Sequence, residues 1–330
     1  MNRACLDLRI KKYSSNNFQI MKNILFVVLF ILTGAAVHAK MGYKIKVEFK
    51  EDIPDTTIYL AKYFAKPPPT IYKIDSAKVI NKRTATFETK DSILGGIYMV
   101  LFNNNSKFAE VIVDNGLNTT MTITPSTLPI GITFTNSAEN EHYVTYQASA
   151  EKYGKLFQEL NKRFEKAKTE KDSSDIRKEY KKVNDEFKEI RMNFIDKYPK
   201  SFIASVFNAI IVPDAPEGKH YLPDGKTEDS LFAFRYIHDH YWDKFNFNDN
   251  RLIHTPLLDG KLNDYFTNYV IPIPDTFNHE ASILLEKMRP SKELFKYTLH
   301  FLAGYTERNK VMGMDESFVY LVENYYAKGD

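Results

Sequence analysis

The chain has 330 residues, 43% of them hydrophobic and 14% aromatic, which is enough for a substantial core and excludes a globally disordered protein. The formal net charge is +3, but residues 1–39 contain five basic residues against one acidic residue, Asp7, and so carry +4. Removing that +4 leaves −1 for the remainder. A near-neutral chain lacks the concentrated basic surface of nucleic acid-binding proteins, so no nucleic acid partner is expected.

Residues 21–39 have the pattern of a cleavable export signal. Met21-Lys22-Asn23 is followed by an unbroken apolar run from Ile24 to Leu32, and Val37-His38-Ala39 offers small residues for signal peptidase. The alternative, a membrane anchor, needs about 20 apolar residues, and this run is shorter. We therefore expect Met21 to be the initiator, residues 1–39 to be leader and signal peptide cleaved after Ala39, and the mature protein to be periplasmic without membrane attachment.

The only cysteine, Cys5, lies in that leader. A mature chain without cysteine forms no disulfide and cannot by itself perform thiol-disulfide chemistry.

Residues 40–140 are expected to form a β-domain. Tyr43–Phe49 alternates apolar and polar residues, as a half-buried strand does. Similar runs recur, separated by turn residues that include Pro67-Pro68-Pro69 and Gly95-Gly96. Further strands are predicted at Thr57–Phe64, Ile71–Val79, Thr84–Thr89, Ile97–Phe102, Ala109–Asp114, Thr120–Thr124 and Ile132–Thr135. Strands of this length and spacing favour an antiparallel sandwich or an open barrel.

Residues 141–212 are expected to form a charged helical hairpin and a following helix. Apolar residues repeat at steps of four and three from Tyr146 to Ala167, and a second such seam runs from Ile176 to Phe194. The polar stretch Lys168–Asp175, which ends in Ser173-Ser174-Asp175, predicts the break and the cap of the second helix. The two seams can pack on each other, and a coiled coil with a partner is the alternative. The following helix is predicted at Phe202–Val212.

Residues 213–229 contain three prolines and two glycines and are expected to be a loop or linker. From 230 to 330 the chain again has a helical pattern, with breaks at Asn246–Asn250, Thr255-Pro256, Ile271–Pro274 and Arg289-Pro290-Ser291. The sequence thus predicts an α+β protein of two domains, with a β-sandwich or open barrel followed by an all-α region.

His238 and His240 are the first candidates for metal ligands. Residues two apart lie on different faces of a helix, whereas a helical metal site uses residues three or four apart. We therefore expect packing or surface histidines rather than a metal site, and no cofactor. The chain also has no Gly-x-Ser-x-Gly elbow, GxGxxG or phosphate-binding loop, so no catalytic residue is predicted.

Several short motifs resemble a known family in the order in which they occur. Ile74-Asp75-Ser76-Ala77, Gly96-Ile97-Tyr98 and the exit Asn136–Asn140 resemble DUF4369. His240-Tyr241-Trp242-Asp243, Asp249-x-Arg251 and Thr255-Pro256-Leu257 resemble DUF5106. This layout is similar to the N-terminal region of Bacteroidetes thioredoxin-like proteins of the TlpA/ResA type.

The resemblance implies a non-catalytic accessory region that positions, dimerises or recruits substrate for a thioredoxin-like domain or another periplasmic redox partner. That domain bears Cys-x-x-Cys in the family, and no such motif occurs here, so the chain is expected to be either a fragment or a free-standing form. The alternatives are a periplasmic or surface protein that binds glycan or peptide, and a metallohydrolase built on His238, His240 and a distant acid. The oligomeric state is left open. Asp75-Ser76-Ala77 and similar triplets also resemble O-glycosylation sequons.

Overall fold

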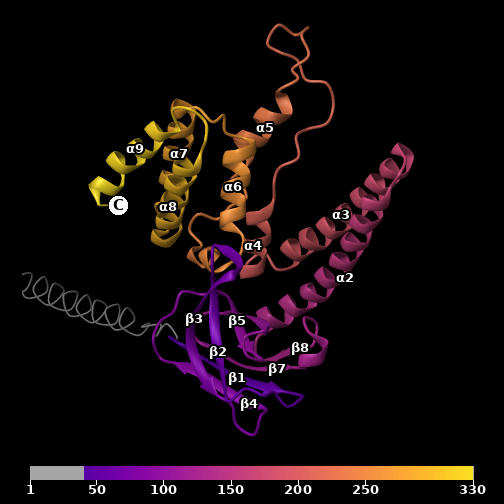
Figure 1. Cartoon of the computed structure of the whole chain (residues 1–330), viewed down its shortest axis with the longest axis vertical. Helices are drawn as coiled ribbons and strands as arrows, with labels where there is room; N and C mark the ends of the chain where they lie inside the picture. The colour runs from indigo at the N-terminus through magenta and orange to yellow at the C-terminus, as the bar shows by residue number, and fades with distance from the viewer. Residues whose placement is uncertain (1–40, 330) are drawn as a thin grey trace, which may run out of the picture. The chain divides into compact units, whose positions relative to one another are not determined.

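The computed structural model describes residues 41–329, apart from the side chains of residues 67–69. The predicted leader and signal peptide lie outside the described residues. Eight strands form two four-stranded sheets, and the remaining described residues are mainly helical (Figure 1). The predicted α+β class and the sandwich are therefore confirmed, and of the two predicted β-architectures the sandwich of two separate sheets is the one formed.

The first sheet has the order β4-β1-β7-β8 and the second the order β3-β2-β5-β6. All strand pairs are antiparallel except β1 and β7, which pair in parallel. The strands are β1 (Tyr43–Phe49), β2 (Thr57–Phe64), β3 (Lys66–Lys78), β4 (Thr84–Thr89), β5 (Gly96–Phe102), β6 (Lys107–Val113), β7 (Leu117–Ile123) and β8 (Ile132–Thr135).

The triplet Pro67-Pro68-Pro69 does not form the predicted turn but lies inside β3. Proline cannot donate a backbone hydrogen bond and is tolerated in an edge strand, where one side of the ladder is open. β3 stands at the edge of its sheet, and its pairing with β2 is irregular between Tyr63 and Phe64. The prediction was wrong because periodicity alone does not reveal which strand is at an edge.

Strand β5 is buried along its whole length. Tyr98, Val100 and Phe102 pack into the core between the two sheets, whereas Ile97, Met99 and Leu101 pack against the helical region. Burial on both faces explains why Ile97–Phe102 is apolar without alternation. The helices therefore share one apolar cluster with the outer face of the β3-β2-β5-β6 sheet.

The helical part comprises eight α-helices and two short 3-10 helices among the described residues. The α-helices are α2 (Ala138–Lys166), α3 (Glu170–Lys197), α4 (Phe202–Ile210), α5 (Phe232–His240), α6 (Leu258–Asn268), α7 (Pro274–Met288), α8 (Lys292–Arg308) and α9 (Met314–Asn324). The 3-10 helices are η2 (Asn250–His254) and η3 (Tyr326–Lys328), and a third, η1 (Pro125–Thr127), belongs to the sandwich. None of the helices in residues 41–329 is long and apolar enough to cross a membrane.

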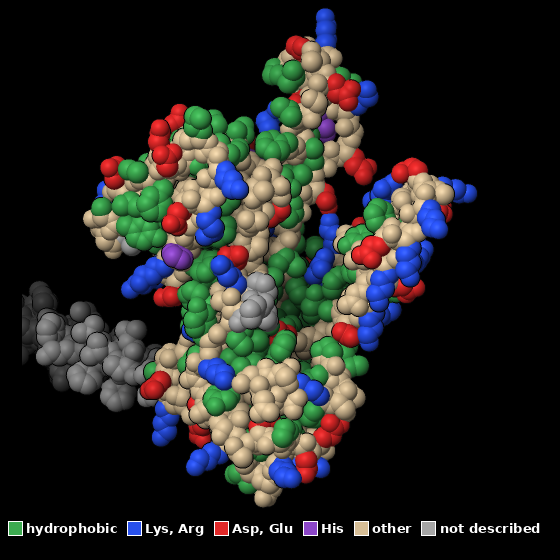
Figure 2. Space-filling view, in the orientation of Figure 1, with side chains coloured by type: hydrophobic (Ala, Val, Ile, Leu, Met, Phe, Trp, Pro, Cys, Tyr) green, Lys and Arg blue, Asp and Glu red, His purple; other side chains and the backbone are tan. Residues whose placement is uncertain are grey.

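Helices α2 and α3 form the predicted hairpin. The ring of Phe187 lies 5.1 Å from that of Tyr153, and the rings of Phe157 and Tyr180 are 5.0 Å apart, so the two seams pack on each other. Acidic and basic side chains are interspersed on its outer surface (Figure 2). The break is shorter than predicted, because Thr169 caps α3 by accepting a hydrogen bond from the backbone of Asp172.

The base of α2 is fixed to the sandwich by side chains. Asn140 accepts a hydrogen bond from the backbone N–H of Ile112 and donates one to its carbonyl, so it pairs this residue on the free edge of β6. The carboxylate of Glu110 accepts hydrogen bonds from the hydroxyls of Tyr63 and Tyr143, at 2.6 and 2.7 Å. The carboxylate of Glu110 in β6 thus links this strand to β2 and to helix α2.

Candidate functional site

The segment around η2 joins the helical region to the sandwich. A Cβ atom built on Gly96 would lie 2.4 Å from the Cβ atom of His254, so only glycine allows this approach. Gly96 also has φ of +146°, a conformation that favours glycine. Nδ1 of His254 donates to the carbonyls of Leu94 and Gly95, both at 3.1 Å. Gly95-Gly96 is therefore a site of close packing between the two regions.

Burial lowers the pKa of His254 to about 4, and the nearby charge of Lys62 acts in the same direction. Its side chain is almost completely buried, with 2% exposure. The imidazole is consequently neutral at neutral pH and acts as a packed hydrogen-bond donor.

An ion pair next to this histidine spans the same junction. The guanidinium of Arg251 binds both carboxylate oxygens of Asp249, at 2.8 and 2.9 Å, and also reaches Asp114 of the sandwich at 3.1 Å. Burial acts to raise the pKa of Asp249, but the hydrogen bonds and charge of Arg251 outweigh it and lower that pKa. Ala65 adds two backbone hydrogen bonds to this junction. Its N–H donates to the carbonyl of Ile253, and its carbonyl accepts from the N–H of Asp259.

The other residues of the DUF5106-like motifs make their contacts within the helical region. Thr255 is buried and donates its hydroxyl to the carbonyl of Leu252 at 2.6 Å, and the adjacent Pro256 is half-buried. Trp242 is 5% exposed and packs among aromatic rings, while Asp243 lies at the surface against His240. Thr255 and Trp242 thus contribute to packing inside the helical region, whereas Asp243 lies at its surface.

Lys261 is a buried cation beside Trp242. Its ammonium lies 4.2 Å from the centre of the Tyr241 ring and 5.2 Å from that of Trp242, and it donates to the carbonyl of Ile211 at 3.3 Å. Burial lowers its pKa to about 8, although the charge of Asp264 opposes this change.

His238 and His240 do not share a site. Nδ1 of His240 contacts Asp243 at 2.7 Å, whereas Nε2 of His238 lies 3.5 Å from Glu280 on α7. Among residues 41–329, no group of three or more His, Cys, Asp or Glu side chains is placed to hold a metal ion. His238, Glu280 and His279 line a polar pocket of about 370 Å³, which the sequence spacing did not indicate.

In the sandwich, the carboxylate of Asp75 links the two sheets. It accepts a hydrogen bond from the hydroxyl of Tyr43 in β1 at 2.9 Å and another from the backbone of Ser76 at 2.7 Å. Ser76 itself is exposed. The Asp-Ser-Ala motif is accordingly a structural link in the sandwich.

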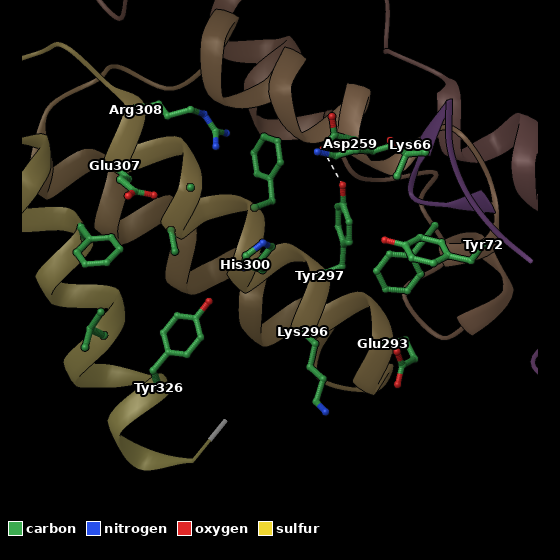
Figure 3. Close-up of a pocket in the computed structure, with 17 residues that line it drawn as sticks. Lys66, Tyr72, Asp259, Glu293, Lys296, Tyr297, His300, Glu307, Arg308 and Tyr326 are labelled. Atoms are coloured by element: carbon green, nitrogen blue, oxygen red, sulfur yellow. Dashed lines mark hydrogen bonds and ion pairs between the residues drawn. The ribbon is translucent and has the colours of Figure 1, made fainter. Parts of the chain in front are cut away.

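A pocket of about 740 Å³ lies between the end of the β2–β3 hairpin and helices α8 and α9 (Figure 3). Phe64, Lys66, Thr70 and Tyr72 of the sandwich form one wall. The other walls come from the helical region, including Asp259, Tyr297, His300, Gly304, Arg308, Phe318 and Tyr326. Both regions of the chain therefore build this pocket.

A hydrogen-bonded group lies where the two walls meet. The hydroxyl of Tyr297 donates to Asp259 at 2.6 Å, and the ammonium of Lys66 lies 3.4 Å from the same oxygen. Burial and the hydrogen bond to Asp259 raise the pKa of Tyr297 well above its usual range, so it remains a neutral donor. The ring of Phe64 packs edge-on against Tyr297, at 5.6 Å, and against Tyr72, at 5.8 Å.

At the other end, the guanidinium of Arg308 extends over Gly304, where an added Cβ atom would lie 3.0 Å from it. Arg308 makes no ion pair with a described residue. In Figure 3, Arg308, His300 and Tyr326 point their polar ends toward this half of the pocket, whereas Lys296 points toward its outer edge. Aromatic faces combined with unpaired polar groups can bind an organic ligand that has both apolar surface and hydrogen-bonding groups.

The sequence reasoning did not identify these pocket residues. Lys296, His300, Gly304 and Arg308 recur every four residues along α8, and that spacing was the available signal of a common helix face. The participation of Tyr72 and Asp259 had no local signal, because they lie far apart in the chain.

Fold and pocket together define an α+β protein in which a β-sandwich and a helical region form one shared site. Residues 43–143 match the family described as Domain of unknown function (DUF4369), and residues 226–329 match the family described as Domain of unknown function (DUF5106). The chain thus contains a DUF4369 region followed by a DUF5106 region, as its motifs indicated. Neither the curated proteins nor the solved structures provide a match to this chain.

Proposed function

We propose that this chain is a non-catalytic binding module, exported to the periplasm by the signal at residues 21–39, that serves as the accessory region of a TlpA-type thiol-disulfide oxidoreductase. The observation that carries the proposal is the 740 Å³ pocket, whose walls come from both the DUF4369 and the DUF5106 region. A pocket formed jointly gives a reason why the two regions occur together: each supplies half of one binding site.

The lack of a thiol supports a non-catalytic role in redox chemistry. Thiol-disulfide exchange begins with attack by a thiolate, and the only cysteine of the chain is Cys5, within the proposed leader. The partner that carries the reactive thiols is therefore proposed to be a thioredoxin-like domain or protein, with the pocket recruiting either that partner or its substrate.

The test uses the chain from Lys40 to Asp330, assayed for reduction of insulin disulfides without added thiol and then, with dithiothreitol as the electron donor, together with each exported thioredoxin-like protein of the same cells. We expect no reduction by the chain alone, and a lower KM or a micromolar complex with one of those proteins. Reduction by the chain itself would overturn the non-catalytic role. Absence of any effect on every thioredoxin-like protein would overturn the accessory role.

A free-standing glycan- or peptide-binding protein is the second candidate, favoured by one specific observation. Tyr72, Phe318 and Tyr326 are large aromatic side chains that are 38–50% exposed around the same pocket. Exposed rings of this kind provide contact area at low cost in conformational entropy. Intact mass of the native protein distinguishes the candidates: a mass that matches Lys40–Asp330 favours the free-standing form, and a mass extended past Asp330 favours the accessory region.

A further inference from the structure

Strand β3 is longer than the strand that it pairs with. It spans 13 residues, whereas β2 has 8, and it lies at the edge of its sheet (Figure 1). No described strand pairs with the outer side of β3. An edge strand presents unpaired N–H and C=O groups to which another extended segment can hydrogen-bond. Prolines 67–69 have no N–H group, so the usable edge is Thr70–Lys78.

This part of β3 carries exposed apolar side chains together with a β-bulge, because its pairing with β2 skips Ile74 between Lys73 and Asp75. Tyr72 and Ile74 are 50% and 41% exposed. Lys73 lies between them, but its ammonium sits 3.7 Å from the centre of the Tyr59 ring and so is occupied by its own sheet. The edge therefore offers apolar side chains next to open backbone groups.

The same strand leads into the pocket. Thr70 and Tyr72 line it on the sandwich side, so the pocket adjoins the part of β3 whose outer edge is open.

The charges around the pocket balance. Lys296 and Arg308 make no ion pair with a described residue, and neither do Glu293 and Glu307, while Lys66 is paired with Asp259. A ligand of strong net charge would meet groups of its own sign as well as the opposite one. Balanced charge fits a ligand whose polar groups are neutral donors and acceptors, as the peptide backbone has.

Apolar side chains contribute to the part of the pocket around α8 and α9, beside the polar ends of His300, Arg308 and Tyr326. Its lining includes Phe301, Ala303, Phe318 and Val322, and the guanidinium of Arg308 extends over Gly304. The apolar lining side chains can contact a bulky apolar side chain, which gains free energy in proportion to the surface it buries.

We propose that the ligand of this site is an extended peptide segment that adds to the outer edge of β3 and inserts one bulky apolar side chain between α8 and α9. The inference rests on the proposed function in one respect, that the pocket is the binding site. Main-chain hydrogen bonds supply affinity and the pocket supplies specificity, which is the usual division in strand addition. A glycan could stack on the exposed rings but would leave the β3 edge unused.

The experiment screens the chain against a library of nine-residue peptides with randomised central positions and against a panel of oligosaccharides. The variant Gly304→Leu fills the pocket on a helix face where leucine is a better helix former than glycine, and Gly304→Ala is the matched control that adds only one carbon. We expect peptides with Phe, Leu, Met or Tyr at one position to bind, with at least tenfold weaker binding to Gly304→Leu and little change for Gly304→Ala.

A second measurement tests the strand addition itself. Two versions of the tightest-binding peptide are made. One is N-methylated at its odd-numbered residues and the other at its even-numbered residues, which gives the two possible registers. A peptide added to a sheet edge directs alternate N–H groups toward its neighbour, so one register should abolish binding and the other should leave it nearly unchanged.

The outcomes separate the two proposals. Equal loss in both registers, or none in either, overturns the strand addition. Oligosaccharide binding that Gly304→Leu weakens, with no peptide bound, overturns the peptide ligand but retains the pocket as the binding site. Ligand binding that Gly304→Leu leaves unchanged, or no binding by either panel, counts against the pocket and so overturns both.

Discussion

Gly96 and His254 approach each other more closely than any side chain at position 96 would allow. The Cβ atom of His254 would lie 2.4 Å from a Cβ atom on Gly96, and the carbonyl oxygens of His254 and Arg251 would lie 3.1 and 3.2 Å from it. The atoms that a side chain at position 96 would meet are thus backbone atoms and a Cβ atom, and these can move only if the backbone of η2 moves. This contact fixes η2 on the sandwich and so positions the two walls of the pocket.

Gly96→Ala is therefore expected to destabilise the protein by about 3 kcal/mol or more. Strain from φ of +146° contributes about 1–3 kcal/mol, and separation of η2 from β5 adds to it. Chemical denaturation measures the free energy of unfolding. Gly154→Ala is the control: nothing lies within 4 Å of its added Cβ atom in α2, and a gain of up to about 1 kcal/mol is expected there. Equal effects at the two positions would contradict the close packing at Gly96.

Stability is expected to fall as the pH is lowered from about 6.5 to about 4, in part because of His254. Its pKa is about 4 in the folded protein against 6.5 in the unfolded chain, so the unfolded chain binds this proton first. The stabilisation is fully present above pH 6.5 and is lost as the pH falls through 4. The loss reaches about 3 kcal/mol, since one pKa unit corresponds to 1.36 kcal/mol.

The measurement for this prediction is the free energy of unfolding between pH 7 and pH 4 for the wild type and for His254→Gln. Glutamine keeps a donor for the carbonyls of Leu94 and Gly95 but does not titrate. A variant that loses stability as steeply as the wild type would show that His254 is not the group responsible.

Arg251→Ala is expected to cost about 3–5 kcal/mol. The carboxylate of Asp249 is 7% exposed and would be left buried without its cation. Asp114→Asn removes the other, half-exposed partner and should cost less than about 1 kcal/mol. Denaturation of both variants measures the difference. Similar costs for the two would mean that the pair with Asp249 is not the principal contact.

Lys261→Met is expected to stabilise the protein by roughly 1–3 kcal/mol at pH 7. Burial holds the folded pKa at about 8 against 10.5 in the unfolded chain, so keeping the charge in the core is unfavourable at neutral pH. Methionine has a similar length and no charge, although the hydrogen bond to Ile211 is lost.

The pH dependence provides the check on Lys261. As the pH rises, Lys261 loses its proton in the folded protein before it does so in the unfolded chain. The destabilisation that Lys261 causes therefore decreases between pH 8 and pH 10.5. The advantage of Lys261→Met over the wild type should therefore shrink across that range. A constant difference would show that the charge is not the cause.

The sequence by itself determined the two-part architecture. The apolar run Ile97–Phe102 indicated a strand, and its lack of alternation corresponds to burial on both faces. The seams of Tyr146–Ala167 and Ile176–Phe194 predicted the hairpin, since each leaves one apolar face that needs a neighbour. Chain-local patterns are sufficient for such elements because side-chain direction follows from backbone period alone.

Only the tertiary structure decided the pocket, the edge position of β3 and the role of His254. Tyr72 and Arg308 line one pocket although 236 positions separate them, and His254 meets Gly96 across 158 positions. Local periodicity fixes which face of an element is apolar, but not which other element covers it. That choice depends on how helices and sheets cross and on which close backbone approaches glycine allows, and these follow from packing of the whole chain.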